Sequence, residues 1–144
     1  MLHLPDGLSQ DSLHMLMTCE PQIKEIGDLI SRTDVLLFGI GTAMRMADQR
    51  HIADDVRKQL VDNHAVGEAL GQYCDIEGKL IYSTNNIGLS LPDVVKVPNV
   101  IAVAGGQEKA SAIIGVMRAC QKGILIIDEQ AAEGMRQLLQ ISAL

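Results

Sequence analysis

The sequence predicts an α/β protein with an open, mostly parallel sheet that has helices on both faces. Three short apolar runs, at residues 35–40, 100–104 and 123–127, contain no charged residue and no alternation of polar with apolar side chains. Uninterrupted runs of this kind are typical of parallel strands that are buried on both faces. Amphipathic segments separate and follow the runs, and this alternation of strand and helix favours a parallel sheet.

A chain of 144 residues has the length of one domain, so we expect residues 1–144 to form a single domain. Hydrophobic residues make up 47% and charged residues 21%, which excludes intrinsic disorder. The net charge of −6 argues against a nucleic-acid-binding surface. No apolar run is long enough to span a membrane and the N-terminus does not resemble a signal peptide, so we expect a cytoplasmic protein without a membrane partner.

The N-terminal part of the chain predicts helices. Apolar residues recur at three- and four-residue spacing from Ser9 to Ile30, which indicates one helix or two. Pro21 separates two helices or lies in a first turn. The first apolar run follows, and the next helix is expected from Ala53 to Asp62.

The middle of the chain, from Gly71 to Leu91, has a different pattern. Asp75–Gly78 contains turn residues, and Lys79–Ser83 alternates as a strand does, so we expect a short antiparallel excursion or edge pair. The second and third apolar runs are each followed by an amphipathic segment. These segments predict helices over Glu108–Ala119 and Glu129–Leu139.

Two glycine-containing loops follow the first two predicted strands, where ligands of open α/β sheets bind. Gly39 and Gly41 lie at the end of the first strand, and Gly105 and Gly106 at the end of the second. Glycine lets backbone amides approach an anion closely. The first loop fits neither the dinucleotide-binding nor the Walker pattern, and a tight strand-to-helix turn is the alternative interpretation.

Four charged residues are candidates for ligand contacts. Lys109 is expected in the first turn of a helix, where a cation opposes the helix dipole unless an anion binds there; the alternative is a solvent-facing lysine. Glu68 lies among small and apolar residues and could bind sugar hydroxyls, pair with Lys109 or Arg50, or act as a base. A helix-surface glutamate is the alternative. Arg45 and Arg50 could hold a phosphate or form surface salt bridges.

Metal, cofactor and nucleophile chemistry are not expected. Cys19, Cys74 and Cys120 form no CxxC pair, and the four histidines form no HExxH pattern. Cys19 and Cys120 have apolar neighbours in helical patterns, so we expect both to be buried. No GxSxG pattern or other nucleophile–base pair is present. Asp128 ends the last predicted strand and is a candidate cap for the following helix.

Several segments together resemble the effector-binding domain of the SorC family of bacterial transcriptional regulators. They are residues 39–41, 67–69, 101–113 and 125–132, and the most specific stretch is Ala-Gly-Gly-Gln-Glu-Lys-Ala-Ser-Ala-Ile at 104–113. The resemblance covers most of the chain from about Asp34 onward and, more loosely, the part before it. It implies a Rossmann-like fold similar to sugar-phosphate isomerases, and a phosphorylated sugar effector such as fructose 1,6-bisphosphate. It also implies that Lys109, Glu68 and Arg50 contact this effector, or Arg45 in a shifted register.

The resemblance further implies how the chain is organised. Family members carry an N-terminal helix-turn-helix domain, which this sequence lacks, and an effector domain nearly twice as long. We therefore expect a partial domain without catalytic activity: the C-terminal, effector-sensing and oligomerising portion of a repressor of sugar-metabolism genes. It would form homo-oligomers and reach operator DNA only through the absent domain.

Two alternatives remain. The first is a sugar-phosphate isomerase or deaminase on the same fold, with Glu68 as base and Lys109 as stabiliser of developing charge. The second is a structural half-domain with an intact sheet and no binding site. Fold alone does not separate them, because one fold supports many functions.

Overall fold

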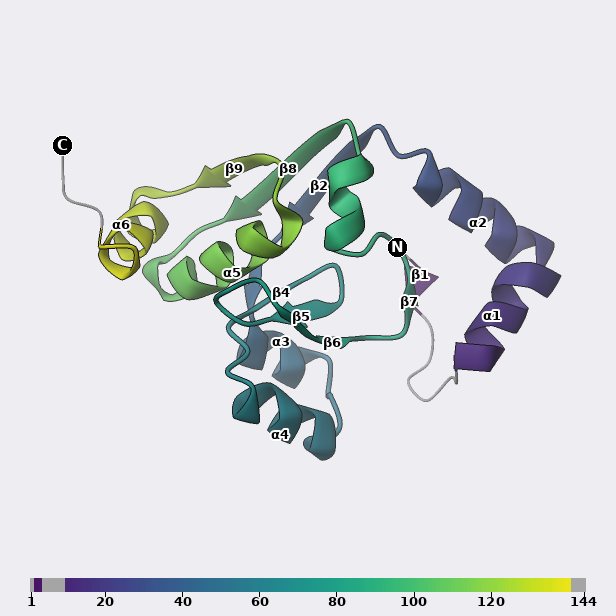
Figure 1. Ribbon diagram of the computed structural model, residues 1–144, viewed down its shortest axis with the longest axis horizontal. Coiled ribbons are helices and arrows are strands. Elements are labelled where there is room, and N and C mark those ends of the chain that lie inside the picture. Colours follow the sequence, from purple (N-terminus) through teal and green to yellow (C-terminus); the bar gives the residue numbers. More distant parts are fainter. Residues whose placement is uncertain (1, 4–9, 141–144) are drawn as a thin grey trace.

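Two helices form an arm at one side of the molecule. The computed structural model describes residues 2–3 and 10–140, and within them α1 spans Gln10–Cys19 and α2 spans Pro21–Ser31. Pro21 occupies the first turn of α2, where its missing N–H is not needed. The helices contact each other and lie at the edge of the molecule, α1 turning back below α2 (Figure 1). The prediction of helices separated at Pro21 is confirmed.

The parallel sheet contains the three predicted strands. They are β2 (Val35–Gly39), β8 (Asn99–Ala104) and β9 (Ile124–Ile127), arranged in the order β2-β8-β9. Both pairings are parallel, and Leu37, Ile101 and Ile124 share one row across the sheet. The α/β class and the parallel arrangement are therefore confirmed.

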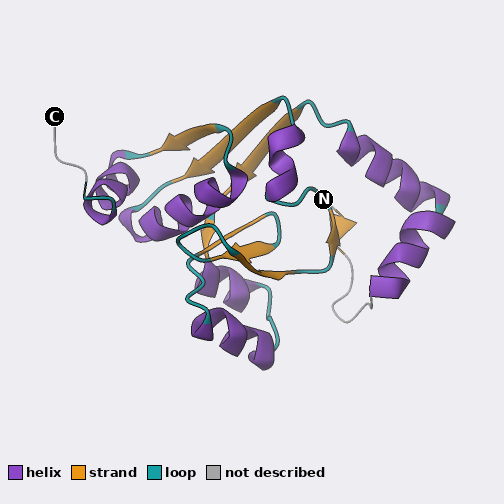
Figure 2. Ribbon diagram, viewed as in Figure 1, coloured by secondary structure: helices purple, strands orange, loops and turns teal. Residues whose placement is uncertain are grey.

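One face of this sheet is covered by helices. These are α5 (Ala110–Cys120), α6 (Glu129–Leu138) and the 3-10 helix η1 (Pro92–Lys96), which lie on the same side of the strands (Figure 2). Phe38, Val100 and Ala102 are buried there, in a core that also contains Ile113 and Val116 of α5.

The other face of the sheet corrects the expectation of helices on both faces. Val35, Leu37 and Ile124 are 58%, 66% and 65% exposed, and none of the described helices covers them. The apolar runs favour burial on both faces, but the helices that follow β8 and β9 both pack on the first face.

A second, antiparallel sheet begins directly after β2. Its order is β3-β4-β5-β6, and the strands are β3 (Gly41–Thr42), β4 (Gly67–Ala69), β5 (Gln72–Cys74) and β6 (Leu80–Ser83). Helices α3 (Ala43–Gln49) and α4 (Asp54–Asp62) pack against it. Ala43, Ala47, Leu60 and Tyr73 form the buried core between them. The predicted excursion is confirmed by β6, whereas β4 and β5 were not predicted.

Helix α5 joins the two sheets. It packs against the parallel strands on one side and contacts β4 on the other. A Cβ atom on Gly67 would lie 2.8 Å from the carbonyl oxygen of Ala112, so only glycine lets β4 approach α5 this closely. This contact holds β4 beside the carboxyl end of β2.

The remaining elements are short. Strand β1 (Leu2–His3) pairs antiparallel with β7 (Asn86–Ile87), and a 3-10 turn η2 (Gln107–Lys109) precedes α5. Within the described part of the chain, every helix is too short or too polar to cross a membrane.

Candidate functional site

A cavity of about 340 Å³ lies at the carboxyl end of β2. This is the position at which open α/β sheets bind ligands. Its wall is formed by the loop after β2, the start of α3, one strand of the second sheet and the end of η2. The lining residues are Gly39, Ile40, Gly41, Thr42, Arg45, Met46, Gln49, Glu68 and Lys109. The structure thus brings together five of the residues considered from the sequence: Gly39, Gly41, Arg45, Glu68 and Lys109.

The side chain of Lys109 links the loop after β8 to the residue that follows the neighbouring strand β2. It ends η2, in the loop after β8, and its Nζ donates a hydrogen bond to the carbonyl oxygen of Ile40 at 3.0 Å. Ile40 follows β2 directly. An ammonium group has three donors, and Ile40 uses one of them. The half-buried cation is thereby fixed at the wall of the cavity.

Glu68 is a buried carboxylate rather than the helix-surface glutamate of the alternative interpretation. It lies in β4 with 3% exposure. Its Oε1 accepts hydrogen bonds from Arg50 Nη2 at 3.0 Å and from the Gly71 backbone N–H at 2.7 Å. Leu70 and Gly71 both have positive φ and form the tight turn that returns the chain into β5. The turn aims the Gly71 amide at the carboxylate.

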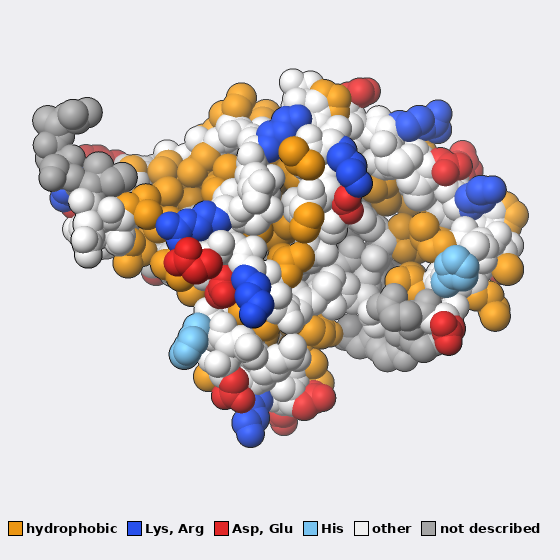
Figure 3. Space-filling model, viewed as in Figure 1, with side chains coloured by type: hydrophobic (Ala, Val, Ile, Leu, Met, Phe, Trp, Pro, Cys, Tyr) orange, Lys and Arg blue, Asp and Glu red, His pale blue; other side chains and the backbone are white. Residues whose placement is uncertain are grey.

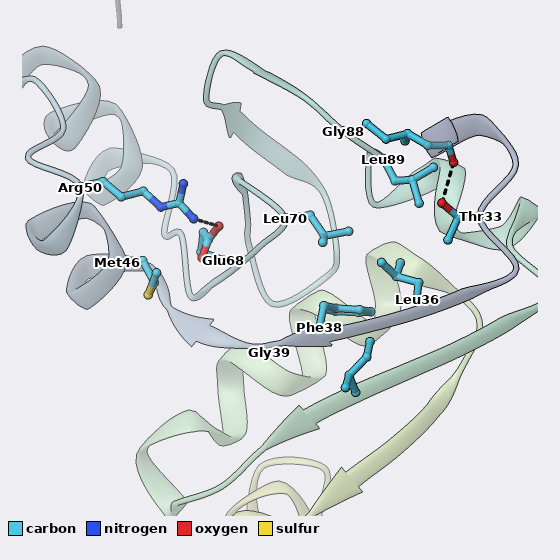
Figure 4. Close-up of a pocket in the computed structure, with 12 residues that line it drawn as sticks. Thr33, Leu36, Phe38, Gly39, Met46, Arg50, Glu68, Leu70, Gly88 and Leu89 are labelled. Atoms are coloured by element: carbon cyan, nitrogen blue, oxygen red, sulfur yellow. Dashed lines mark hydrogen bonds and ion pairs between the residues drawn. The ribbon is translucent and has the colours of Figure 1, made fainter. Parts of the chain in front are cut away.

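Arg50 and Glu68 also line a second cavity of about 410 Å³ (Figure 4). This cavity runs along β2 past Leu36 and Phe38, and its walls combine apolar side chains with polar groups. The two cavities share Gly39, Met46 and Glu68, so the carboxylate stands where they meet. Arg50, predicted as a ligand contact, therefore reaches the first cavity only through its ion pair with Glu68.

The glycines after β8 are engaged differently. The Gly106 N–H donates to both carboxylate oxygens of Asp128, at 3.1 and 2.9 Å. Asp128 also accepts from the Ala131 N–H and caps α6, as predicted. These backbone hydrogen bonds, from Ala131 first and then Gly106, hold the pKa of Asp128 below its ordinary value. Gly105 and Gly106 line neither cavity. The Gly106 N–H, predicted to be available to a ligand anion, instead donates to the carboxylate of Asp128.

Tyr73 is a residue of this region that the sequence analysis missed. It faces Glu68 across the β4–β5 pair, and side chains directly opposite in antiparallel strands share a face. Its buried hydroxyl and the buried Nε of Arg50 have no hydrogen-bond partner. Burial first, and the charge of Glu68 second, raise the pKa of Tyr73. β4 and β5 have only three residues each, so no sequence pattern places this tyrosine beside Glu68.

The cysteines carry no site of their own. Cys74 and Cys120 are buried, and burial raises their pKa values to about 12 and about 11. Cys19 is exposed, which corrects the expectation that it is buried; it ends α1 on the projecting arm. Among the residues that the structure describes, His, Cys, Asp and Glu form no cluster of three that could hold a metal.

A family model described as "Putative sugar-binding domain" matches residues 1–137. The central glycolytic genes regulators of Priestia megaterium and Bacillus subtilis are 38% and 35% identical to the chain over 133 residues. The match covers 92% of this chain and 39% of each regulator, so the chain spans about two-fifths of their length.

Solved structures agree with the observed fold. A SorC family transcriptional regulator from Enterococcus faecalis superposes with a TM-score of 0.80 at 38% identity, covering 93% of this chain and 54% of that one. The full-length sorbitol operon regulator SorC from Klebsiella pneumoniae superposes with a TM-score of 0.73 at 24% identity. That comparison covers 92% of this chain and 43% of the regulator, and it supports the fold alone.

Proposed function

The chain belongs to the sugar-binding domain family of SorC-type transcriptional regulators, and we propose that it senses a phosphorylated sugar such as fructose 1,6-bisphosphate. In this proposal it is the effector-binding and oligomerising portion of a repressor, and operator DNA is bound by another domain. The observation that carries the proposal is the convergence of Lys109, Arg45 and Glu68 on one cavity at the carboxyl end of β2.

Each residue suits one part of a sugar phosphate. Lys109 and Arg45 supply positive charge to a phosphate, and charge-assisted hydrogen bonds are the strong ones. The backbone at Gly39 and Gly41 allows a close approach by the same group. Glu68 offers carboxylate oxygens that accept hydrogen bonds from sugar hydroxyls.

The geometry supports binding more than catalysis. Oε1 of Glu68 is engaged by Arg50 and Gly71, and this holds the carboxylate in one position. Aldose–ketose isomerisation or deamination needs an acid and a base that move protons on the substrate. The titratable residues lining the cavity are Arg45, Glu68 and Lys109, of which Glu68 alone suits the role of base. Isomerase or deaminase activity is therefore the alternative hypothesis, and the experiment below distinguishes it from binding alone.

The test is a titration of the 144-residue chain with fructose 1,6-bisphosphate, followed by amide NMR shifts so that weak binding is measurable. We expect shifts at Gly39–Gly41 and at Lys109. A charge-assisted hydrogen bond is worth about 1.5–3 kcal/mol, so Lys109→Ala should weaken binding roughly 10- to 150-fold. Lys58→Ala is the matched control, because Lys58 is exposed on α4 and lies outside the cavity.

Two results would overturn the proposal. Equal affinities of the Lys109→Ala and Lys58→Ala variants would remove Lys109 from the site. Conversion of fructose, glucosamine or ribose phosphates, followed by NMR and abolished by Glu68→Gln, would establish the enzyme instead.

A further inference from the structure

Lys109 is a fixed cation in an electrostatically unfavourable position. On the open surface over α4 and the arm, lysine and arginine side chains lie among acidic ones (Figure 3). Lys109 is instead half-buried, and its Nζ donates to the carbonyl oxygen of Ile40 at 3.0 Å. It also occupies the N-cap position of α5, where the helix dipole opposes a positive charge. Other contacts must therefore hold the backbone that carries Lys109.

Asp128 holds the backbone of η2, the turn that ends at Lys109. The Gly106 N–H donates to both carboxylate oxygens of Asp128, at 3.1 and 2.9 Å. The carbonyl oxygen of Gly106 accepts from the Lys109 N–H at 3.1 Å. The two backbone groups of one glycine thus connect the carboxylate at the start of α6 to the residue that carries the cation.

The ionised state of Asp128 strengthens this connection. Hydrogen bonds from the Ala131 and Gly106 N–H groups lower the pKa of Asp128, and the nearby charge of Lys109 lowers it further. The carboxylate is therefore an anion at neutral pH, and hydrogen bonds to ionised acceptors are about twice as strong as neutral ones. Because Asp128 is exposed, solvent screens its attraction to Lys109. The hydrogen bond to Gly106 is thus the main link.

The body of α6 holds η2 at a second point. α6 contacts both η2 and α5, and Gly134 is buried at this contact. A Cβ atom on Gly134 would lie 2.9 Å from Cβ of Ala110 and 3.1 Å from the carbonyl oxygen of Gln107. Glycine is a poor residue for a helix interior, and the close approach of α6 to the junction of η2 and α5 explains its presence.

We propose that Asp128 and Gly134 are positioning residues that fix η2, so that the ammonium group of Lys109 lies at the wall of the 340 Å³ cavity. Neither residue lines this cavity, so both act through Lys109. The inference rests on the proposed function, because the anion that Lys109 binds there is the phosphate of the sugar. Coupling between two sites is reciprocal, so a ligand on Lys109 also stabilises the contacts between η2 and α6.

Two substitutions of Asp128 separate positioning from helix capping. Serine and asparagine are both favourable N-cap residues. The serine hydroxyl is one bond shorter than the carboxylate, so Asp128→Ser keeps a cap but loses the reach to Gly106. Asp128→Asn keeps the Oδ1 atom, which accepts from both Ala131 and Gly106. A residue that only caps α6 would tolerate both changes, whereas a positioning residue is rescued by asparagine alone.

Gly134→Ala tests the second contact without changing a charge. Alanine favours a helix interior over glycine, so any loss of ligand affinity would come from the contact with η2. Gly27→Ala in α2 is the matched control. There an added Cβ would lie 3.3 Å from Cε of Met17, the end of a flexible side chain. We expect Gly134→Ala to weaken binding and Gly27→Ala to leave it unchanged.

The experiment titrates the 144-residue chain and its variants with fructose 1,6-bisphosphate and follows the amide NMR shifts. Asp128→Ser should weaken binding about 5-fold or more, which is the lower end of typical coupling between sites, and Asp128→Asn should weaken it less. Glu129→Gln should leave the affinity unchanged, because Glu129 is the exposed carboxylate next to Asp128 in the first turn of α6. In the wild type, saturating ligand should slow hydrogen exchange at the Gly106 N–H.

A measurement without ligand distinguishes this proposal from the proposed function. The Gly41 amide follows the carbonyl that accepts from Lys109, so its nitrogen shift reports that hydrogen bond. Asp128→Ser should move this shift in the same direction as Lys109→Met does. A wild type that does not bind fructose 1,6-bisphosphate contradicts the proposed function, and the Gly41 shift then decides the positioning role.

Two outcomes overturn the proposal. One is an Asp128→Ser variant with the Gly41 shift of the wild type and, where the wild type binds, the same affinity. The other is equal weakening of binding by Asp128→Ser and Glu129→Gln, which would assign the effect to net charge. If Asp128→Ser does not fold, Gly134→Ala against Gly27→Ala decides by the same two measurements.

Discussion

The two sheets of this molecule are incomplete in opposite ways. The parallel sheet has apolar surface without a cover, at Leu37 and Ile124. The small antiparallel sheet and the end of α3, which packs against it, have buried polar atoms without hydrogen-bond partners, at Tyr73 Oη and Arg50 Nε, next to a buried ion pair. The parallel sheet therefore has one exposed apolar face, whereas the antiparallel sheet contributes the buried carboxylate of the site. Mutations in the two sheets should therefore affect stability by different mechanisms.

The largest effect is expected at the ion pair of the antiparallel sheet. Arg50→Met removes the cation and leaves the carboxylate of Glu68 buried, with 4% of its side chain exposed. Removing one partner of a buried pair costs about 3–5 kcal/mol. We expect about 3 kcal/mol, the lower end, because the Arg50 side chain is 25% exposed. Urea unfolding of the wild type and the variant measures this loss.

A double variant separates the ion pair from simple packing. Arg50→Met with Glu68→Gln removes both charges but keeps an oxygen that accepts the Gly71 N–H. We expect the double variant to be more stable than Arg50→Met alone. A double variant that is equally unstable or worse would show that the lost stability comes from packing around Arg50 rather than from the buried negative charge of Glu68.

The next effect distinguishes the two faces of the parallel sheet. Val100 is 4% exposed on the covered face, and Val35 is 58% exposed on the bare face. Val100→Ala should cost about 2 kcal/mol, from about 0.8 kcal/mol per buried methylene plus a cavity term. Val35→Ala should change the free energy of unfolding by less than about 0.5 kcal/mol. Equal losses in urea unfolding would mean that the bare face is already covered in solution, for example by self-association.

The parallel sheet could be predicted from the sequence because its strands are long enough to show a pattern. Five residues without a charge, as at Val35–Gly39, indicate a buried strand. The same pattern could not show that one face stays bare, because the residues on both faces are equally apolar. The prediction that Cys19 is buried was wrong for a related reason. The apolar spacing correctly predicted a helix, but α1 lies at the edge of the molecule and leaves the thiol exposed.

The antiparallel sheet could be predicted only in part. β4 and β5 have three residues each, too few to establish a two-residue period. Glu68 was identified from the cost of burying a carboxylate, and Arg50 was one of two partners considered. The choice between Arg50 and Lys109 depends on how β4 packs against α3 and α5, which is tertiary information. For the same reason, the sequence did not reveal that the carboxylate of Asp128 accepts a hydrogen bond from the Gly106 N–H.

A smaller effect is expected at the thiols around α5, where the two sheets meet. Burial raises the pKa of Cys74 to about 12 and of Cys120 to about 11, from 9.0. Above pH 9 the unfolded chain releases these protons while the folded chain retains them, so stability falls as pH rises. Each thiol should contribute a loss of about 1 kcal/mol by pH 10.

Urea unfolding under reducing conditions at pH 8, 9 and 10 measures this decline. Cys120→Ala should make the decline shallower. Cys19→Ser, at an exposed thiol, should leave it unchanged and serves as the control. A wild-type stability that is constant from pH 8 to pH 10 would contradict the prediction.

The smallest effect is expected at Tyr73, the unpartnered hydroxyl of the antiparallel sheet. Tyr73→Phe keeps the ring, which packs against Tyr82 with centroids 6.0 Å apart, and removes a buried group that has no hydrogen-bond partner. An unsatisfied buried polar group costs about 1–3 kcal/mol, so the variant should be as stable as the wild type or about 1 kcal/mol more stable. Because burial raises the pKa of Tyr73 above its ordinary value of 10.0, the wild type loses further stability above pH 10, and the advantage of the phenylalanine should grow there. Urea unfolding at pH 7 and pH 10.5 tests both points, and a loss of about 1 kcal/mol at pH 7 would instead show that the hydroxyl binds a buried water.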